Sequence, residues 1–323
     1  MTAAPATLSV HGLAYRYAER AVLHDVSFDV HAGEVVALMG PNGCGKSTTL
    51  SVLGGLTAPQ GGTVRFEGRT VARGDRALRA ELGFVFQSPS LDVKLTARQN
   101  LALAARMHGL SGAAASEAVS GALMRAGLES RAGDAVETLS GGMRRRLDIA
   151  RAMLHGPRVL LLDEPTTGLD ERAWRLTWQQ IRQIATGGDA AVLLTTHRPE
   201  EAERADRVLV MDAGRIVADD TPHALLARVQ GDVIVLRAAD PEALAGELAR
   251  RLDLHGVVEG RDVHVTAPRG HELIVRIVED LPRGLLSSVS LRQPGLGDVF
   301  LALTGGALDS EPGTADDALE VAA

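Results

Sequence analysis

The chain of 323 residues contains very little cysteine and very little lysine. Cys44 is its only cysteine, so no disulfide can form within the chain and the cysteine content gives no sign of an oxidising compartment. Lysine occurs only at Lys46 and Lys94, and the other 32 of the 34 basic residues are arginine. We interpret the arginine excess as a bias toward GC-rich codons and not as an arginine-driven binding surface.

Long apolar runs and a leader-like N-terminus are also missing. Met1 to Val10 lacks both the basic n-region and the apolar h-region of a signal peptide. The uncharged run from Ser47 to Val64 contains four glycines and one proline, so it is not a membrane span. The net charge of −7 gives no general attraction to nucleic acid or anionic lipid. We therefore expect a soluble, cytoplasmic protein with no nucleic-acid partner.

Residues 40–47 fit the phosphate-binding loop pattern G-x-x-x-x-G-K-[ST]. Val35 to Met39 is typical of a buried strand and Ser47 to Leu53 of a helix start, which is the context that the motif requires. Lys46 is expected to reach the β- and γ-phosphates of a nucleotide, and the Ser47 hydroxyl to ligate Mg²⁺. The candidate phosphate-binding residues are Gly40, Pro41, Asn42, Gly43, Cys44, Gly45, Lys46, Ser47 and Thr48.

The segment before this loop is predicted to form antiparallel strands over residues 7–30. Asp25 to Val30 alternates apolar and polar residues, as a half-buried strand does. Tyr17 lies between these strands, 23 residues before the loop, where its ring could stack on an adenine. The alternative is a tyrosine at a strand edge with one end in water, and the spacing alone favours this alternative.

A continuous apolar strand, Val159 to Leu162, leads into Asp163 and Glu164. Such a strand is typical of the middle of a parallel sheet. Ligands of these sheets bind beyond the carboxyl ends of the strands. Asp163 is therefore expected near the phosphates, holding Mg²⁺ through its water shell, and Glu164 near an attacking water.

Two other strand-like segments end in polar residues. Leu82 to Phe86 leads to Gln87, whose amide could bond Mg²⁺ or an attacking water, or could be an ordinary polar strand end. Ala190 to Leu194 leads to His197, which could contact a γ-phosphate oxygen. A lone histidine at a strand end is more often structural, so neither residue is informative by itself.

Ser140 is predicted to cap a helix over Met143 to Leu154. Gly141 and Gly142 would expose backbone N–H groups at the start of this helix, which makes a second candidate anion site. The alternative is an ordinary glycine-rich helix cap. The arginine run at 144–146 is interpreted as a solvated face.

Together these features resemble the nucleotide-binding subunit of an ABC transporter over residues 7–225. They follow the family order of adenine-stacking loop, Walker A, Q-loop, signature motif, Walker B with its catalytic glutamate, D-loop and switch histidine. The matching residues in that order are Tyr17, 40–47, Gln87, Leu139–Met143, Leu160–Glu164, Gly168–Asp170 and His197. Met143 replaces the usual glutamine and Cys44 occupies a variable loop position, but neither departure removes a group that the reaction needs.

The resemblance implies that ATP and Mg²⁺ are held between two copies of the chain, as a homodimer in the ATP-bound state. Ser140, Gly141 and Gly142 of one copy would bind the γ-phosphate of the nucleotide on the other copy, and Asp170 would link the two sites. The implied catalytic residues are Glu164, His197 and Gln87, and the implied Mg²⁺ ligands are Ser47, Gln87 and Asp163.

The region after residue 228 is predicted to be a separate domain. Its elements follow the order β-α-β-β-α-β over residues 232–291, which suggests a ferredoxin-like fold. Leu291 to Gly305 resembles the C-terminal stretch of antibiotic-export ATPases of the daunorubicin-resistance type. Because residues 230–305 carry no catalytic constellation, we assign them to assembly or regulation. Residues 307–323 contain five acidic and no basic residues and are expected to be a disordered tail.

The sequence therefore predicts an α/β chain with two globular domains, which its length and its 45% hydrophobic residues allow. Residues 1–228 are expected to form a P-loop NTPase core of the ABC ATPase type. This core would combine a parallel sheet, an antiparallel β edge and an inserted helical subdomain at 88–155. Residues 229–306 would form the small α+β domain.

The expected function is ATP hydrolysis that powers an exporter of the ABC-2, multidrug or antibiotic-like type. Its membrane-spanning permease would be a separate chain that holds this protein at the cytoplasmic face of the membrane. One alternative is a soluble ribosome-associated cassette protein, but these usually join two cassettes. The other is a DNA-maintenance ATPase, but these usually carry a long coiled coil, whereas only 92 residues separate Ser47 from Leu139.

Overall fold

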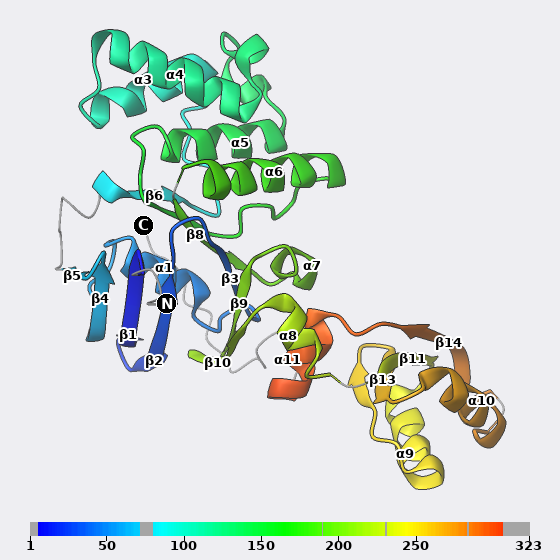
Figure 1. The fold of residues 1–323 in the computed structure, drawn as a ribbon. Helices are drawn as coiled ribbons and strands as arrows, with labels where there is room; N and C mark the ends of the chain where they lie inside the picture. Colours follow the sequence, from blue (N-terminus) through cyan, green and yellow to red (C-terminus); the bar gives the residue numbers. More distant parts are fainter. Residues whose placement is uncertain (1–5, 72–79, 189, 230, 283, 306–323) are drawn as a thin grey trace. The chain divides into compact units, whose positions relative to one another are not determined.

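The computed structural model describes residues 6–71, 80–188, 190–229, 231–282 and 284–305 (Figure 1). The chain divides into two compact units, Met1–Asp219 and Asp220–Ala323. This division lies before the boundary that was expected after residue 228. It does so because α8 (Pro222–Leu226) contacts α11 (Leu296–Thr304) and therefore belongs to the second unit. The acidic segment 307–323 lies outside the described residues. Among the described residues, none of the helices has the length and apolar character needed to cross a bilayer.

A six-stranded sheet forms the centre of the first unit. Its strand order is β10-β9-β3-β8-β7-β6, and the neighbours from β9 to β6 pair in parallel. Every residue of β3, β7 and β8 is buried, as expected for strands covered on both faces. The strands are β3 (Val35–Met39), β6 (Leu82–Val85), β7 (Val159–Leu162), β8 (Ala191–Thr196), β9 (Arg207–Asp212) and β10 (Arg215–Asp220).

An antiparallel sheet with the order β2-β1-β4-β5 accompanies the parallel one. One hydrophobic core joins the two sheets through α1 (Lys46–Leu53), with Leu13 and Phe28 on one side and Leu161 on the other. The predicted antiparallel edge is therefore confirmed. Its strands are β1 (Leu8–Tyr17), β2 (Arg20–Val30), β4 (Gly61–Phe66) and β5 (Arg69–Thr70).

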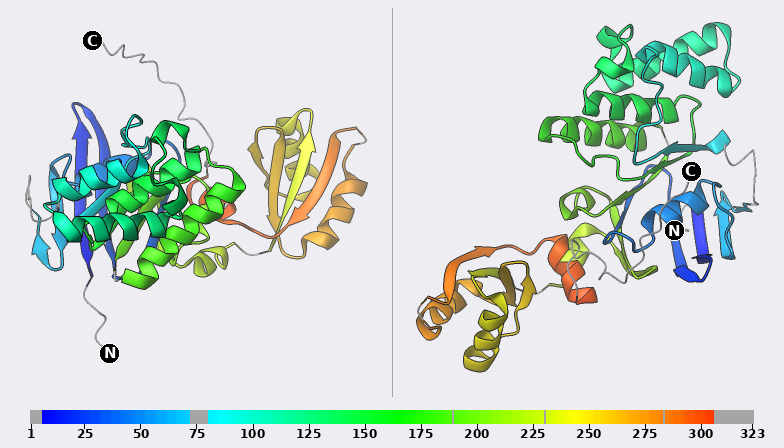
Figure 2. Two further views of the ribbon diagram at one scale, coloured as in Figure 1. Left: turned by 90° about the horizontal axis from the view of Figure 1, so that it is seen from above. Right: turned by 180° about the vertical axis from the view of Figure 1, so that it is seen from behind.

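The segment between β6 and β7 forms the predicted helical subdomain, with a hydrophobic core of its own that includes Leu101, Leu123 and Leu147. Figures 1 and 2 both show α5 beside α6. The elements of this segment are α3 (Ala97–Met107), α4 (Gly112–Ala126), two short 3₁₀ helices (Glu129–Arg131 and Val136–Thr138) and α5 (Gly141–Ala152). Two further helices come later in the chain, α6 (Glu171–Gly188) after β7 and α7 (Pro199–Ala202) after β8.

The sequence predicted a start of α5 at Met143, but the helix begins at Gly141. Ser140 is the N-cap, as predicted, and its hydroxyl accepts a hydrogen bond from the Met143 backbone N–H at 3.3 Å. Both glycines therefore lie inside the first turn. Gly142 is required there, because a Cβ atom at this position would lie 2.4 Å from Cβ of Ala173 in α6.

The second unit contains a four-stranded antiparallel sheet of order β12-β13-β11-β14 with two helices, which confirms the ferredoxin-like arrangement. Leu244 and Leu248 of α9 and Ile277 of α10 pack on the sheet residues Ile234 and Val263. The elements are β11 (Asp232–Ala238), α9 (Pro241–Leu252), β12 (Val257–Glu259), β13 (Asp262–Ala267), α10 (Gly270–Asp280) and β14 (Leu286–Arg292).

A buried carboxylate fixes the turn from β14 into α11. Asp298 accepts hydrogen bonds from both terminal nitrogens of Arg292, at 2.5 and 2.8 Å, and from the Gly295 backbone N–H at 2.8 Å. Such bidentate arginine–carboxylate pairs fix geometry as well as charge. Arg292 and Asp298 both belong to the stretch that resembles antibiotic-export ATPases, and in the structure they fix this turn.

Two histidines stack where the helical subdomain meets the sheet. The rings of His108 and His155 are parallel to within 4°, with centroids 3.8 Å apart. His155 Nε2–H donates to the Leu82 carbonyl of β6 at 3.2 Å. Burial lowers the pKa of His155 from 6.5 to about 4, and it also lowers the pKa of His108.

As the pH is lowered from 6.5 to about 4, we expect the free energy of unfolding to decrease. In that range the unfolded chain protonates His155 and the folded chain does not. His155→Phe keeps the ring stack and removes the titrating group. In this variant the decrease in the free energy of unfolding on acidification should be smaller by about 1–2 kcal/mol, a figure reduced for the partial solvent exposure of the ring. Urea unfolding of both proteins at pH values near 7 and near 4.5 measures the difference, and identical pH dependence would contradict the assignment.

Candidate functional site

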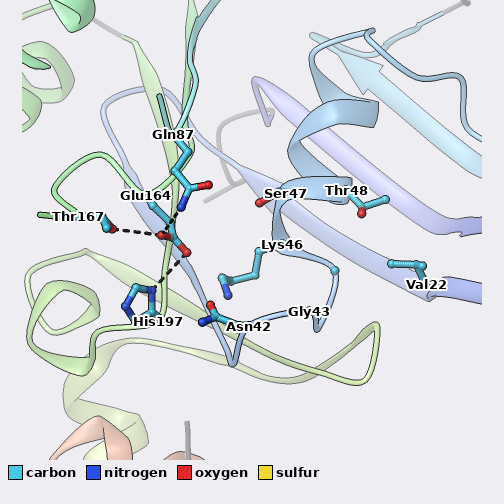
Figure 3. Close-up of a pocket in the computed structure, with 11 residues that line it drawn as sticks. Val22, Asn42, Gly43, Lys46, Ser47, Thr48, Gln87, Glu164, Thr167 and His197 are labelled. Atoms are coloured by element: carbon cyan, nitrogen blue, oxygen red, sulfur yellow. Dashed lines mark hydrogen bonds and ion pairs between the residues drawn. The ribbon is translucent and has the colours of Figure 1, made fainter. Parts of the chain in front are cut away.

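A cavity of about 430 Å³ lies where the carboxyl ends of β3, β6, β7 and β8 meet the start of α1 (Figure 3). Because these strands are parallel neighbours, their carboxyl ends lie at one edge of the sheet. The lining combines the phosphate loop with residues that follow the other three strands and with one residue of β2. It consists of Val22, Asn42, Gly43, Gly45, Lys46, Ser47, Thr48, Gln87, Glu164, Thr167 and His197.

The phosphate loop presents free backbone N–H groups to this cavity. Gly45 is the N-cap of α1 in the left-handed conformation, with φ 113°, and no side chain caps the helix among the described residues. A Cβ atom at Gly45 would also lie 2.8 Å from Cδ2 of Leu23. The uncapped N–H groups and the helix dipole make this end of α1 a binding site for an anion such as a phosphate.

The Lys46 side chain is buried beneath the loop. Its Nζ donates to the Gly40 carbonyl at 2.8 Å and to the Pro41 carbonyl at 2.9 Å. A phosphate oxygen in the cavity would compete with these two neutral acceptors for the ammonium group. Because a phosphate oxygen carries a negative charge that a carbonyl oxygen lacks, the phosphate is the favoured partner of the ammonium group.

Three donors from three segments hold the Glu164 carboxylate. Oε2 accepts from Gln87 Nε2 at 3.2 Å and from Thr167 Oγ1 at 3.1 Å, and Oε1 accepts from His197 Nδ1–H at 3.2 Å (Figure 3). Glu164 is 9% exposed, and its backbone has φ 43°, a conformation that is strained for a residue other than glycine. The carboxylate is thus oriented in the cavity, where it can accept a proton from a bound water.

Asp163 faces the start of α1. Its Oδ1 accepts from Ser47 Oγ at 3.1 Å and from Thr195 Oγ1 at 2.7 Å. The Thr195 hydroxyl in turn accepts a hydrogen bond from the Glu164 backbone N–H at 2.9 Å, so this one residue holds the Asp163 carboxylate and the Glu164 backbone. A carboxylate beside a hydroxyl is a donor set of hard oxygens that fits Mg²⁺.

Comparison with known proteins identifies the family. Residues 23–167 match the family model described as "ABC transporter". The "Nod factor export ATP-binding protein I" of Paraburkholderia xenovorans (strain LB400) is 41% identical over 300 residues, which cover 90% of this chain and 94% of the relative. The chain belongs to the ATP-binding subunits of ABC transporters.

Solved structures agree with this assignment. An ATP-binding subunit of an ABC transporter matches with a TM-score of 0.61 and 34% identity, over 69% of this chain and 92% of that one. An ATP-binding cassette in a dimeric, post-hydrolysis state bound to ADP and Pi matches with a TM-score of 0.59 and 29% identity, over 66% and 98% of the two chains. The protein is an ABC ATPase with a P-loop NTPase fold that binds and hydrolyses ATP.

The cavity brings together the Walker A residues from Asn42 to Thr48, except Cys44, with Gln87, Glu164 and His197 of this ABC ATPase. Cys44 is only 6% exposed and packs in the hydrophobic core, where burial raises the pKa of its thiol. Its side chain therefore does not line the cavity, and its expected role toward ATP stays a prediction.

The remaining predicted site residues do not line this cavity. Tyr17 is 51% exposed and meets the ring of Tyr15 edge-on, with centroids 4.9 Å apart. Asp170 Oδ1 accepts the Ala173 backbone N–H at 2.7 Å, at the start of α6. Ser140, Gly141 and Gly142 form the first turn of α5. Their expected roles toward ATP stay predictions.

Two residues of the site had no signal in the sequence. Thr167 lines the cavity and Thr195 bridges the Asp163 carboxylate and the Glu164 backbone N–H, but each stands within an ordinary run of polar residues. Thr195 follows Leu194, which pairs with Leu162 just before Asp163. Only the register of β8 against β7 could have singled it out.

The contacts of Lys46 lead to a test of nucleotide binding. Lys46→Met should weaken ATP binding about ten- to a hundredfold, since hydrogen bonds to charged groups are worth about 1.5–3 kcal/mol. The matched control is Lys94→Met, which removes the other lysine, an exposed side chain paired with Glu137 at 2.9 Å. Calorimetric titration with ATP measures both variants. Equal affinities would show that Lys46 does not contact the phosphates.

Proposed function

We propose that this ABC ATPase powers export of the ABC-2, multidrug or antibiotic-like type through a separate membrane-spanning permease. In this proposal it acts as a homodimer in the ATP-bound state, with Mg²⁺ at each nucleotide, peripheral on the cytoplasmic face of the membrane. The name of the relative from Paraburkholderia, which assigns that protein to Nod factor export, supports an exporter. It counts against the ribosome-associated and DNA-maintenance alternatives.

The observation that carries the homodimer is the position of the second anion site. The first turn of α5 exposes Ser140 and Gly141, yet neither residue lines the cavity that holds Lys46 and Glu164. A helix start with two glycines binds anions through backbone N–H groups, as the start of α1 does. A second copy of the chain would bring this turn to the nucleotide. The dimeric post-hydrolysis cassette among the solved structures supports the same arrangement.

The contacts in and beside the cavity support a role in hydrolysis for each of the following residues. Ser47 and Asp163 would hold Mg²⁺, which supplies positive charge to the phosphates when bound. Glu164 would take the proton of the attacking water, with Gln87, Thr167 and His197 fixing its carboxylate. The amide nitrogen of Gln87 points to Glu164, so Gln87 serves the base directly, and its role as a Mg²⁺ ligand is the weaker part of the proposal.

Glu164→Gln tests the base and the homodimer together. The amide keeps the size of the side chain but cannot accept the proton, so turnover should fall about 10²- to 10⁴-fold while ATP affinity is retained. With hydrolysis blocked, the ATP-bound dimer should accumulate. Size-exclusion chromatography with light scattering should show a dimer with ATP and Mg²⁺ and a monomer without them. Wild-type turnover would refute the base, and a monomer under both conditions would refute the homodimer.

A second cavity, of about 400 Å³, adjoins the first and is a candidate site for the permease. Gln87 and Thr167 line both cavities, so a partner that binds in the second cavity can change the positions of these two residues in the first. The other lining residues are Ser88, Pro89, Leu91, Val93, Val136, Gly141, Arg144, Arg145, Gly168 and Leu169.

We propose that a short cytoplasmic helix of the permease, with an apolar face, occupies this second cavity. Val93 is 42% exposed there, while Leu91 lines the cavity and also packs against the core of the helical subdomain. The arginine side chain of Arg144 in the lining favours an acidic residue on the partner helix. Leu95, two residues after Val93, does not line this cavity.

Val93→Glu tests this contact better than a change at Leu91, because Val93 is not part of the core. The charge should leave basal ATP hydrolysis within about twofold and should abolish stimulation by the permease in vesicles. The matched control is Leu103→Glu, a change of another exposed apolar residue, 49% accessible, that does not line this cavity. If Leu103→Glu lost stimulation and Val93→Glu kept it, the permease would dock on α3 instead.

The second unit is proposed to act in assembly or regulation. Its described residues contain the folded sheet and helices but contribute nothing to the nucleotide cavity of the first unit. The similarity to the exporter relative covers 90% of this chain and therefore extends beyond the ATPase core into the second unit. This supports a role of the second unit in the transporter complex.

A further inference from the structure

A stripe of charged side chains on α5 faces the turn that carries Gln87. Arg145, Asp148 and Arg151 are spaced three residues apart, which places them along one side of a helix. Arg145 is 4% exposed and Asp148 is fully buried. The sequence predicted that the arginine run at 144–146 would be a solvated face, and for Arg145 this prediction is wrong.

The stripe holds both ends of the turn between β6 and the helical subdomain. Arg145 Nη1 donates to the Phe86 carbonyl at 2.6 Å, and its Nη2 donates to the Gln87 carbonyl. At the far end, Arg151 Nη2 donates to Ser90 Oγ at 2.6 Å and pairs with Asp148 Oδ1 at 2.9 Å. Residues 86–90 are therefore tied to α5 at two points, through two backbone carbonyls at one end and the Ser90 hydroxyl at the other.

The contact continues into the nucleotide cavity. Arg145 fixes the backbone of Gln87, and the side chain of the same residue donates to Glu164 Oε2 at 3.2 Å. One buried guanidinium is thus connected to the carboxylate through a single intervening residue.

Stability alone does not account for these buried charges. Burial lowers the pKa of Arg145 and raises the pKa of Asp148, which is the sign of an electrostatic cost for both groups. Apolar replacements of buried ion pairs are often neutral or stabilising, so such a group is better explained by the geometry that it imposes. A planar guanidinium with two donors on successive carbonyls imposes that geometry strictly.

We infer that Arg145 is a positioning residue for ATP hydrolysis: it sets the reach of Gln87 so that the Gln87 amide orients the Glu164 carboxylate. This inference rests on the proposed role of Glu164 as the base. Arg145 itself does not touch the nucleotide in this scheme, and its effect passes entirely through Gln87.

The first test compares Arg145→Met with Arg146→Met. Arg146 is the matched control, because it is the next residue of α5 and its Nε also donates to a backbone carbonyl, that of Ala126, at 3.0 Å, but within the helical subdomain. Arg145→Met should lower kcat about ten- to a hundredfold, since misplacement by about 1 Å can cost about 100-fold, with KM for ATP within about twofold. Arg146→Met should lower the thermal unfolding midpoint to a similar degree and leave kcat within about twofold of wild type.

Arg145→Lys provides the conservative variant. An ammonium group can reach one of the two carbonyls, so kcat should recover part of the loss seen with methionine. Recovery of kcat only in proportion to the unfolding midpoint, or an equal loss of kcat in Arg145→Met and Arg146→Met, would mean that Arg145 acts only on stability.

The second test is a double-mutant cycle with Gln87→Met. If Arg145 acts through Gln87, then Arg145→Met should cause no further loss of kcat in the Gln87→Met background. Independent, multiplying losses would overturn the inference. The role of the Gln87–Glu164 contact and the positioning role of Arg145 can be refuted separately. Wild-type kcat in Gln87→Met would refute the use of the Gln87–Glu164 contact in hydrolysis. A reduced kcat in Gln87→Met beside a wild-type kcat in Arg145→Met would refute the positioning role alone.

Discussion

Strands that are buried on both faces have room for polar side chains only where they end, and the nucleotide site depends on this constraint. β3, β7 and β8 are buried at every position. Their polar neighbours begin at the carboxyl ends, with the phosphate loop after β3, Asp163 and Glu164 after β7, and His197 after β8. Because the strands are parallel neighbours, packing of the apolar core also gathers the charged groups at one edge.

The same constraint explains how the carboxylates are held. At the edge of a buried sheet water is scarce, so each charged oxygen needs partners from the protein. Thr195 supplies one hydroxyl to Asp163 and accepts the Glu164 N–H, while Gln87, Thr167 and His197 supply the donors to Glu164. The left-handed backbone of Glu164 is tolerated because these contacts fix it from several sides.

Local patterns predicted the site wherever a residue and its chemistry adjoin in the sequence. The phosphate loop, the strand end at Glu164 and the cap at Ser140 are of this kind, because each needs only a few neighbouring residues to be recognised. Gln87 was assigned only through the family resemblance. The contributions of Thr195 and Arg145 could not be predicted in this way. Thr195 depends on the register of two strands, and Arg145 faces a turn 58 residues earlier in the chain. An arginine run looks the same whether it faces water or a backbone carbonyl.

Helix α5 joins features that the sequence presents as unrelated. Its first turn approaches α6 so closely that only glycine fits at 142, and α6 begins beside Asp170. One turn later, Arg145 holds the Gln87 backbone. A rigid helix transmits displacement along its length, so a shift of its first turn displaces the guanidinium as well. In the proposed homodimer, that first turn meets the nucleotide of the other copy. In that homodimer, the contacts of α5 would connect the turn at the nucleotide of the other copy to Gln87, whose amide donates to Glu164 within the same chain.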